Sequence, residues 1–204
     1  MSPLQNRVQP TGEISALTAR GTLTGNRGIL HRPDGTLGPS RWKHTHWVCC
    51  ELCHNGRYHG PMPANGWTAL FFLDEAVALA AGHRPCHACR RPDAHRFHAA
   101  WETAHGPLRS TAEIDSALHP TRVTRSRQQV RHTATAESLP PGTFILTDGP
   151  YLLTATAALR YSPAGYVRAD PRPTGAVTVL TPAPVTAVLA NGYLPRLHPS
   201  SKMS

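Results

Sequence analysis

The sequence predicts an α+β protein with two small β-rich halves and short helices. Apolar runs with the length of strands occur in both halves, at 68–73, 144–147 and 176–180. Helical patterns follow the first and the last of these runs. The 20 prolines and 16 glycines among 204 residues favour short elements joined by many turns. A chain of this length can bury a core as one domain or as two small ones.

The segment 11–73 is predicted to be mostly β, because turn sequences divide it into short stretches. Asp34-Gly35 and Asn55-Gly56 are dipeptides that favour the tight turns of β-hairpins. Apolar stretches precede both turns. We therefore expect several short antiparallel strands in this part of the chain.

Two helices are predicted to follow these strands. The first runs from about Asp74, a good N-cap residue, to Ala81, and Gly82 ends it. The second opens at Pro92 and runs to about His105. Its apolar face is formed by Ala94, Phe97, His98 and Trp101.

The remainder of the chain divides into a basic segment and a second β-rich part. Residues 106–138 carry several arginines and few acidic residues, and we interpret them as a basic linker or arm. The last predicted helix spans 182–190. The predicted organisation is a zinc-bearing β-rich module with helices at 1–105, the linker or arm, and a small β-rich domain with one C-terminal helix at 139–204.

The ends of the first and last predicted helices resemble each other. Residues 78–85 align without gaps with residues 188–195, and each copy has a glycine followed by a proline. Two interpretations stay open. The chain contains a degenerate duplication that kept its cysteines only in the first copy, or both helices use a common way of ending.

The charge balance favours polyanionic partners. The 21 lysines and arginines outnumber the 12 acidic residues, which leaves a net charge of +9. Arginine neutralises phosphates with a planar fork, so nucleic acid, DNA in preference to RNA, is the expected partner. A GC-rich genome and a solvated linker are the alternative explanations for the arginines. Those expected to contact nucleic acid are Arg27, Arg84, Arg90, Arg91, Arg96, Arg122, Arg125, Arg127 and Arg131.

The sequence indicates a cytoplasmic protein with no membrane partner. No apolar run approaches the ~18 residues of a membrane span. The first residues lack the apolar core of a signal peptide. An odd number of cysteines, five, argues against a disulfide framework and favours reduced thiols. The oligomeric state stays open.

All five cysteines lie close together in the N-terminal half, and their spacing predicts a metal site. Cys86 and Cys89 are separated by two residues on a turn just past the first helix, so both sulfurs can bind one ion. Cys49, Cys50 and Cys53 lie upstream. Thiolate ligands of this kind are typical of Zn²⁺, which is the predicted cofactor.

The cysteine-containing segment resembles the zinc module of the Ada family of bacterial DNA alkylation-repair proteins, and related small zinc modules attached to nucleases. In that family a C-x3-C pair precedes a helix that ends Ala-Ala-Gly-aromatic-Arg-Pro, followed by C-x2-C. Here Cys49-x3-Cys53 matches the first pair, and the tract 80–85 leads into Cys86-x2-Cys89. The resemblance covers roughly residues 44–92.

The resemblance implies a zinc ion held by Cys49, Cys53, Cys86 and Cys89 in a protein of DNA repair or processing. In the Ada-type module a zinc-bound thiolate accepts a methyl group from a phosphotriester. Carried over to this chain, that role would fall on Cys49.

The spacing of the first cysteines leaves the ligand set open. If they lie on an extended strand, Cys49 and Cys53 face the same side but are ~13 Å apart. Thiolates on one zinc ion must lie within roughly 4 Å of each other, so the chain would have to bend. Otherwise one of these cysteines binds and a histidine completes the set. Cys50 shares a face with Val48 and Leu52 and is interpreted as a buried core thiol. The candidate histidines are His46, His54, His59 and His87.

These observations together predict a zinc-stabilised nucleic-acid-binding protein in which the zinc is structural. One alternative is an enzyme that acts on DNA, either a zinc-thiolate alkyl acceptor or a nuclease with a base from His44-x-His46. The other is a structural zinc protein with a protein-interaction role. The chain contains no P-loop, dinucleotide fingerprint or Ser-His-Asp arrangement. Whether any reaction is catalysed stays open.

Overall fold

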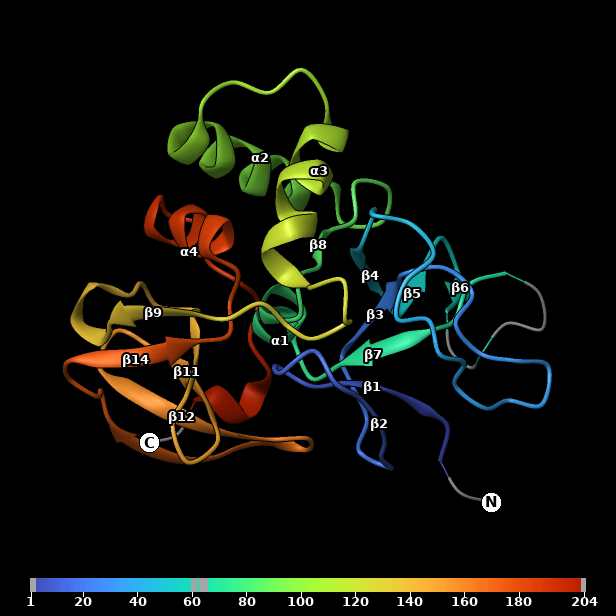
Figure 1. The fold of residues 1–204 in the computed structure, drawn as a ribbon, viewed down its shortest axis with the longest axis horizontal. Coiled ribbons are helices and arrows are strands. Elements are labelled where there is room, and N and C mark those ends of the chain that lie inside the picture. Colours follow the sequence, from blue (N-terminus) through green and yellow to red (C-terminus); the bar gives the residue numbers. More distant parts are fainter. Residues whose placement is uncertain (1–2, 60–61, 63–65, 203–204) are drawn as a thin grey trace.

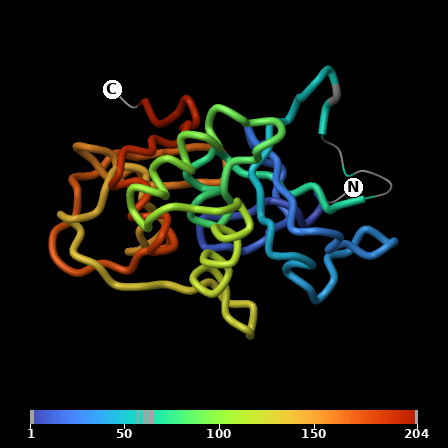
Figure 2. The backbone as a smooth tube through the Cα atoms, turned by 90° about the horizontal axis from the view of Figure 1, so that it is seen from above, coloured from blue at the N-terminus to red at the C-terminus, as the bar shows by residue number. Residues whose placement is uncertain are grey.

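The structure is a computed structural model that describes residues 3–59, Met62 and residues 66–202. Two six-stranded β-sheets and four α-helices are found in these residues (Figure 1). The predicted α+β class with two β-rich halves is therefore confirmed. Figure 2 shows from above that the N-terminal and C-terminal strands lie on opposite sides of the molecule, with the middle of the chain between them.

The first sheet is built from the N-terminal half. Its strand order is β2-β1-β7-β3-β4-β8, with β1–β7 and β4–β8 parallel and the other neighbours antiparallel. Its strands are β1 (Gln5–Val8), β2 (Ile14–Ala16), β3 (Leu23–Asn26), β4 (Val48–Glu51), β7 (Leu70–Phe72) and β8 (Arg84–Pro85).

A separate hairpin follows β4 and confirms one of the predicted turns. It pairs β5 (Cys53–His54) with β6 (Arg57–Tyr58). Its two central residues have positive φ, 50° at Asn55 and 72° at Gly56. Asparagine and glycine tolerate this left-handed conformation, which the tightest hairpin turns require at both positions.

The second sheet is antiparallel throughout and is built from the C-terminal half. Its strand order is β13-β12-β11-β10-β14-β9. Its strands are β9 (His132–Thr135), β10 (Phe144–Leu146), β11 (Pro150–Leu153), β12 (Ala157–Ser162), β13 (Gly165–Pro171) and β14 (Ala176–Val179).

The helices begin and end close to the predicted residues. Asp74 caps the first, where its Oδ1 accepts from the N–H of Val77 at 3.0 Å, and Gly82 follows with φ of 83°. The α-helices are α1 (Glu75–Ala80), α2 (Arg91–His105), α3 (Thr111–Arg122) and α4 (Ala183–Ala190), and two 3-10 turns are η1 (Ala136–Ser138) and η2 (Pro199–Ser201).

Helix α1 lies at the centre of the molecule, between the two sheets (Figure 1), and all six of its residues are buried. Its Val77 belongs to a core cluster that contains Phe72 of the first sheet and Phe144 of the second. On its other side, Leu79 packs in a cluster with residues of α2, α3 and α4. The two halves therefore share one core.

The segment 106–138, predicted to be a linker or arm, is instead folded into the molecule. It contains α3, whose Ile114 and Leu118 are fully buried. It also contains β9, which pairs with β14 at the edge of the second sheet. Its basic composition concealed apolar residues with helical spacing, which are sufficient to anchor a short helix.

Candidate metal centre

Strand pairing at the edge of the first sheet brings distant cysteines together. Strands β4 and β8 are parallel neighbours, and the N–H of Cys86 donates to the carbonyl of Cys49 at 2.9 Å. This pairing places Cys50 beside Cys86. A turn closed by the N–H of Arg90 on the carbonyl of Cys86, at 2.9 Å, then brings Cys89 back toward the strand.

The three cysteines Cys50, Cys86 and Cys89 can hold a metal ion. Their sulfur atoms lie within 4.8 Å of one another, and all three side chains are half-buried. Thiolates bound tetrahedrally to zinc at ~2.3 Å lie about 3.8 Å apart, so a small contraction would place these sulfurs on one ion. The N–H of Glu51 also donates to Sγ of Cys89 at 3.4 Å. Amide donors of this kind stabilise thiolate charge.

Hydrogen bonding within this three-thiol group divides the protons unequally. Bonds from Cys50 and Cys89 lower the pKa of Cys86, whereas bonds to Cys86 and Cys89 raise the pKa of Cys50. One thiolate is thus stabilised by neighbouring S–H donors. A bound divalent cation would favour the deprotonated form of all three, because it replaces those donors with a full positive charge.

Cys49 does not belong to the three-thiol group, contrary to the predicted ligand set. Its side chain is 1% exposed and lies in the core, where Sγ accepts from Nη1 of Arg90 at 3.5 Å. Burial raises the pKa of its thiol. An alkyl acceptor must be an accessible thiolate. Cys49 therefore lacks both properties that the acceptor role would demand.

The interpretation of Cys50 as a core thiol is also wrong, for a reason of register. Alternate residues of a strand do face opposite sides, as assumed. The buried side of β4, however, is the one that carries Trp47 and Cys49, whereas Val48 and Cys50 are half-buried. Period-two alternation separates the faces but does not say which of them is covered.

Cys53 lies outside the three-thiol group and is exposed at the start of β5. The pair predicted from the sequence was Cys49-x3-Cys53. With Cys50 as the ligand on β4, the spacing to Cys53 becomes two residues, the same as between Cys86 and Cys89. This second C-x2-C was present in the sequence and is the clue that was missed.

No histidine joins the three-thiol group among the residues that the structure describes. Nδ1 of His46 contacts Oδ2 of Asp115 at 2.8 Å instead. The ring of His87, an exposed residue inside the C-x2-C turn, lies 5.2 Å from that of His95 and 6.1 Å from that of His98. The four histidines predicted as alternative ligands, His46, His54, His59 and His87, therefore lie elsewhere.

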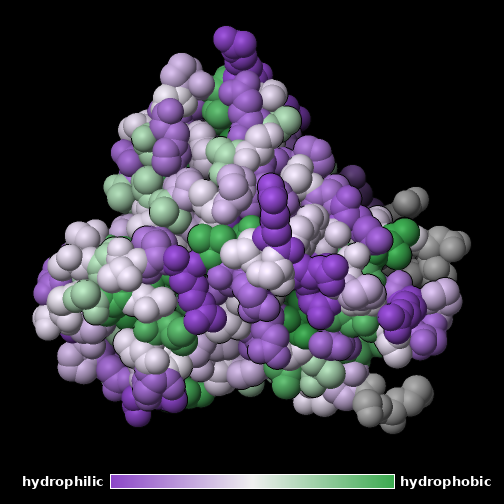
Figure 3. Space-filling view, viewed as in Figure 1, coloured by the Kyte–Doolittle hydropathy of each residue, from purple (hydrophilic) through white to green (hydrophobic). Residues whose placement is uncertain are grey.

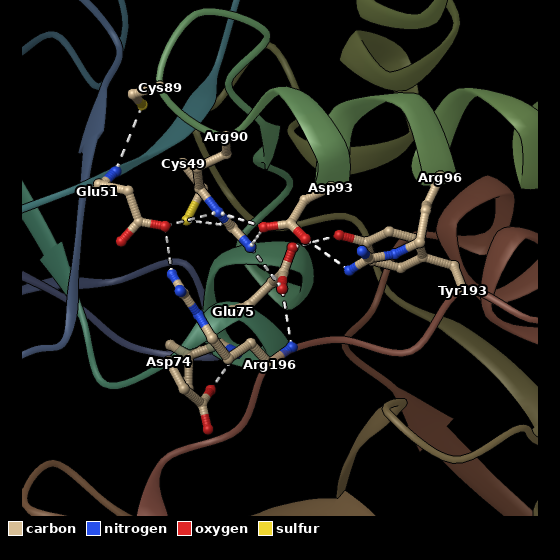
Figure 4. Close-up of polar contacts among 11 residues, drawn as sticks. Cys49, Glu51, Asp74, Glu75, Cys89, Arg90, Asp93, Arg96, Tyr193 and Arg196 are labelled. Carbon is tan, nitrogen blue, oxygen red and sulfur yellow. Dashed lines mark hydrogen bonds and ion pairs between the residues drawn. The ribbon is translucent and has the colours of Figure 1, made fainter. Parts of the chain in front are cut away.

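Beneath the three-thiol group, Arg90 is the centre of a buried ion-pair network (Figure 4). Its Nη2 lies 2.8 Å from Glu75 and 2.6 Å from Asp93, and its Nε lies 3.4 Å from Glu51. The side chain is fully buried. Arg90 was predicted to contact nucleic acid, but its guanidinium instead forms ion pairs with these buried or half-buried carboxylates. It joins the turn before α2 to α1 and β4.

Three further arginines predicted to contact nucleic acid are buried. Arg84 forms two hydrogen bonds to Asp115, Nε at 2.9 Å and Nη2 at 2.7 Å. Arg27 and Arg122 lie over the ring of Trp47, with Cζ at 4.0 Å and 4.1 Å from its centroid. Their guanidiniums therefore face the interior rather than bulk solvent.

The other five arginines predicted to contact nucleic acid are exposed: Arg91, Arg96, Arg125, Arg127 and Arg131. Arg96 pairs with Asp93 at 2.5 Å. In the described part of the chain, the other four form no ion pair with a carboxylate. They occupy two places, the start of α2 and the segment between α3 and β9.

The fold and the three-thiol group define an α+β protein with a candidate metal centre at a sheet edge. Comparisons with family models, with curated proteins and with solved structures returned no match to this chain. None of the helices in the described ranges combines the length and the hydrophobicity needed to cross a bilayer.

Proposed function

We propose that this protein binds nucleic acid, DNA in preference to RNA, and that a zinc ion on its cysteines stabilises the fold. The observation that carries the proposal is the surface segment 123–131, called here the arginine loop. It presents three exposed arginines without carboxylate partners in the described structure: Arg125, Arg127 and Arg131. Exposed guanidiniums whose charge no carboxylate neutralises attract phosphates.

The arginine loop is ordered by its own contacts. An antiparallel bridge between Val123 and Gln129 closes it. Nε2 of Gln129 lies within hydrogen-bond distance of the carbonyls of Pro10, Ala80 and Leu180, so it joins the loop to α1 and to both halves. Arginines on a pre-ordered loop lose less conformational entropy on binding than those on a free arm. In Figure 3, hydrophilic side chains lie near the centre of the face shown, with hydrophobic side chains visible between them.

The start of α2 extends the proposed binding surface. Arg91 is the first residue of the helix and Arg96 follows within its second turn, both exposed. Helix N-termini favour phosphate because their first N–H groups have no intrahelical partner. The C-x2-C turn directly precedes this helix, so a metal ion there would hold its N-terminus in place.

The zinc part of the proposal rests on the three-thiol group. Thiolates at this spacing suit Zn²⁺ better than the hard cations that prefer oxygen ligands. Cys53 is the proposed fourth ligand, because it has the same spacing from Cys50 as Cys89 has from Cys86. A closed site of four thiolates would be structural. It would link β4, the β5–β6 hairpin and the turn before α2.

Elemental analysis of the purified protein tests the zinc proposal. We expect one zinc ion per chain in the wild type, and loss of zinc in Cys50→Ser, Cys86→Ser and Cys89→Ser. Cys53→Ser should weaken zinc retention against a chelator. Cys49→Ser is the matched control and should retain the metal. A wild-type protein without zinc, or retention in Cys86→Ser, would contradict the proposal.

Fluorescence anisotropy with labelled duplex DNA, single-stranded DNA and RNA tests nucleic-acid binding. The triple change of Arg125, Arg127 and Arg131 to Gln should weaken DNA binding and lower the slope of log K against log salt by about 0.9 for each phosphate that is no longer neutralised. The control changes Arg20, Arg32 and Arg109 to Gln, which removes equal charge from exposed sites elsewhere. Equal losses of affinity in both triple variants, or no DNA binding by the wild type, would refute the proposal.

A further inference from the structure

A polar cavity of about 450 Å³ lies between the arginine loop and the N-terminal strands. Five arginines contribute to its wall, whereas a single acidic residue, Glu13, does so. Its lining also includes Trp47 and glutamine side chains. The five arginines are Arg27, Arg41, Arg122, Arg127 and Arg131.

Two of these arginines are held deep inside the protein by neutral partners. Arg27 donates from Nε to Nε2 of His83 at 3.1 Å and from Nη2 to the carbonyl of Ala81 at 3.3 Å. Neither of these bonds uses its Nη1. Arg27 is 2% exposed, so a full positive charge sits beside neutral groups in the interior.

Arg122 is likewise held inside the protein by neutral partners. It donates from Nη1 to the carbonyl of Gly82 at 2.9 Å and from Nη2 to the carbonyl of Thr45. Its Nε is buried and has no hydrogen-bond partner among the described residues. The carboxylate of Asp115 is already occupied by Arg84.

The two guanidiniums lack the compensation that buried charges need. Neither forms an ion pair with a carboxylate in the parts of the chain that the structure describes. Burial, together with repulsion from Arg122, lowers the pKa of Arg27 to about 9. Burial also lowers the pKa of Arg122 to about 9, although the charge of Asp115 offsets part of the effect. Buried charges without an opposite charge are strongly unfavourable. A bound anion would supply that charge.

We propose that this arginine-lined cavity binds a phosphate monoester. Several arginines around one cavity suit a ligand with three terminal oxygens and a double negative charge. The cavity is large enough to take a substituent beside the phosphate. Cations already cover Trp47, so recognition rests on charge and hydrogen bonding rather than on stacking against this ring.

Two sources present the same phosphate group, a free mononucleotide and the phosphorylated end of a nucleic-acid strand. The second would deepen the proposed function, since the arginine loop forms both the rim of the cavity and part of the proposed nucleic-acid surface. The first would not depend on it.

Thermal unfolding and titration calorimetry test the inference on the full chain. The probes are inorganic phosphate, deoxyadenosine monophosphate, and a short single-stranded oligonucleotide with and without a terminal phosphate. We expect a higher Tm in phosphate than in chloride of equal ionic strength, because a ligand that binds only the folded state stabilises it. Preference for the phosphorylated oligonucleotide identifies a strand end, and equal or tighter binding of the mononucleotide identifies the free ligand.

Matched variants separate the cavity from general charge attraction. Arg131→Gln at the rim should weaken phosphate-monoester binding by about tenfold, the loss of one charge-assisted hydrogen bond. Arg109→Gln removes the same charge from an exposed site that lines neither the cavity nor the proposed nucleic-acid surface, and it should leave binding unchanged. Arg27→Gln should lose binding if it folds, and if it does not, the comparison of Arg131→Gln with Arg109→Gln decides.

An absence of phosphate stabilisation, or equal losses of affinity in Arg109→Gln and Arg131→Gln, would overturn the inference. DNA binding without phosphate binding would refute the cavity site alone. Phosphate binding without DNA binding would refute the proposed function alone.

Discussion

Helices α1 and α4 end with the same backbone geometry, but the residues that follow them have different surroundings. We call the end of α1, at Gly82 and His83, the first exit, and the end of α4, at Gly192 and Tyr193, the second exit. In each, a glycine adopts positive φ, 83° at Gly82 and 90° at Gly192. Its N–H donates to the carbonyl three residues back, and the N–H of the next residue, His83 or Tyr193, donates to the carbonyl five residues back. This is the hydrogen-bond pattern of a common helix ending.

The similarity of the exits extends to the strands before them. Strand β7 precedes α1 and is antiparallel to β3, which is also antiparallel to β4. Strand β14 precedes α4 and has the same relation to β10 and β11. The similarity ends at these strands, because β7 is parallel to its other neighbour β1, whereas β14 is antiparallel to β9. Both interpretations of the repeated helix ends therefore stay open.

The side chains at the two exits meet opposite electrostatic environments. His83 is buried beside Arg27 and Arg122, two cations without a carboxylate partner in the described structure. Tyr193 is buried too, but its hydroxyl donates to the carboxylate of Glu75, which Arg90 neutralises. At the second exit, Arg90 balances the negative charge of Glu75. At the first exit, no anion among the described residues balances the charges of Arg27 and Arg122. We infer that the second exit stabilises the fold, whereas the first exit lies beside the arginine-lined cavity and the candidate metal centre.

Arg90→Met should produce the largest effect, because Arg90 neutralises the carboxylate on which the second exit depends. Removing one partner of a buried ion pair leaves an uncompensated charge on Glu75, and we expect a loss of about 3–5 kcal/mol in unfolding free energy. Urea denaturation at measured zinc content checks this. Arg96→Gln, which breaks the exposed pair with Asp93, should cost no more than about 1 kcal/mol. Similar losses in the two variants would show that Glu75 does not need its partner.

Replacing each exit glycine with alanine should give the next largest difference in stability between the two exits. A Cβ at Gly82 would lie 2.6 Å from Cδ and 2.7 Å from Cβ of Arg122, whereas at Gly192 nothing lies within 4 Å. Both changes incur the penalty for positive φ, about 1 kcal/mol. Gly82→Ala must also displace Arg122, which adds an overpacking cost of about 1–3 kcal/mol. Denaturation curves giving equal losses would mean that Arg122 moves freely, and that the first exit is no tighter than the second.

Tyr193→Phe should have a smaller effect confined to the second exit. It removes the hydroxyl that donates to Glu75 and leaves the ring packed against Phe97. A hydrogen bond to a charged group contributes about 1.5–3 kcal/mol, so we expect a loss in that range in chemical denaturation. Tyr58→Phe, at a residue that is 58% exposed, should stay within about 0.5 kcal/mol of the wild type. An unchanged free energy of unfolding in Tyr193→Phe would mean that the hydrogen bond to Glu75 does not stabilise the second exit.

Local sequence patterns predicted the elements at both exits. Glycine after an apolar helical stretch marks the end of α1 at Gly82 and of α4 at Gly192, because only backbone conformation is involved. The Asn55-Gly56 turn was predicted for the same reason. The unpredicted strand β9, within the segment 106–138, depends on β14, a partner distant in sequence. No local pattern contains that information.

The site was predicted in part, and its errors have a physical origin. The Cys86–Cys89 turn follows from spacing, and the structure brings both residues into the three-thiol group. To predict Cys50 rather than Cys49 as the metal ligand, one would have to know which face of β4 the core covers. Likewise, a count of arginines cannot separate Arg84, which is buried on Asp115, from Arg125, which is exposed. Whether an arginine is buried or exposed depends on the partners that the fold brings near it.

The mildest test of the comparison is the pH dependence of stability at the first exit. Burial, and then repulsion from Arg27 and Arg122, holds the pKa of His83 well below 6.5. The folded protein therefore keeps His83 neutral while the unfolded chain protonates it below pH 6.5. Because the unfolded state then binds more protons, stability falls as the pH decreases from 6.5 toward the folded pKa, by about 1.4 kcal/mol per pH unit.

His83→Gln isolates this contribution, since glutamine can still accept the hydrogen bond from Nε of Arg27 but does not titrate. Urea denaturation between pH 7 and pH 5 should give a shallower loss of stability in the variant than in the wild type. The other histidines with lowered pKa are common to both proteins, and their effect cancels in the difference. Parallel pH curves would mean that His83 is protonated in the folded state. Its two arginine neighbours would then have to be neutralised by an anion already bound.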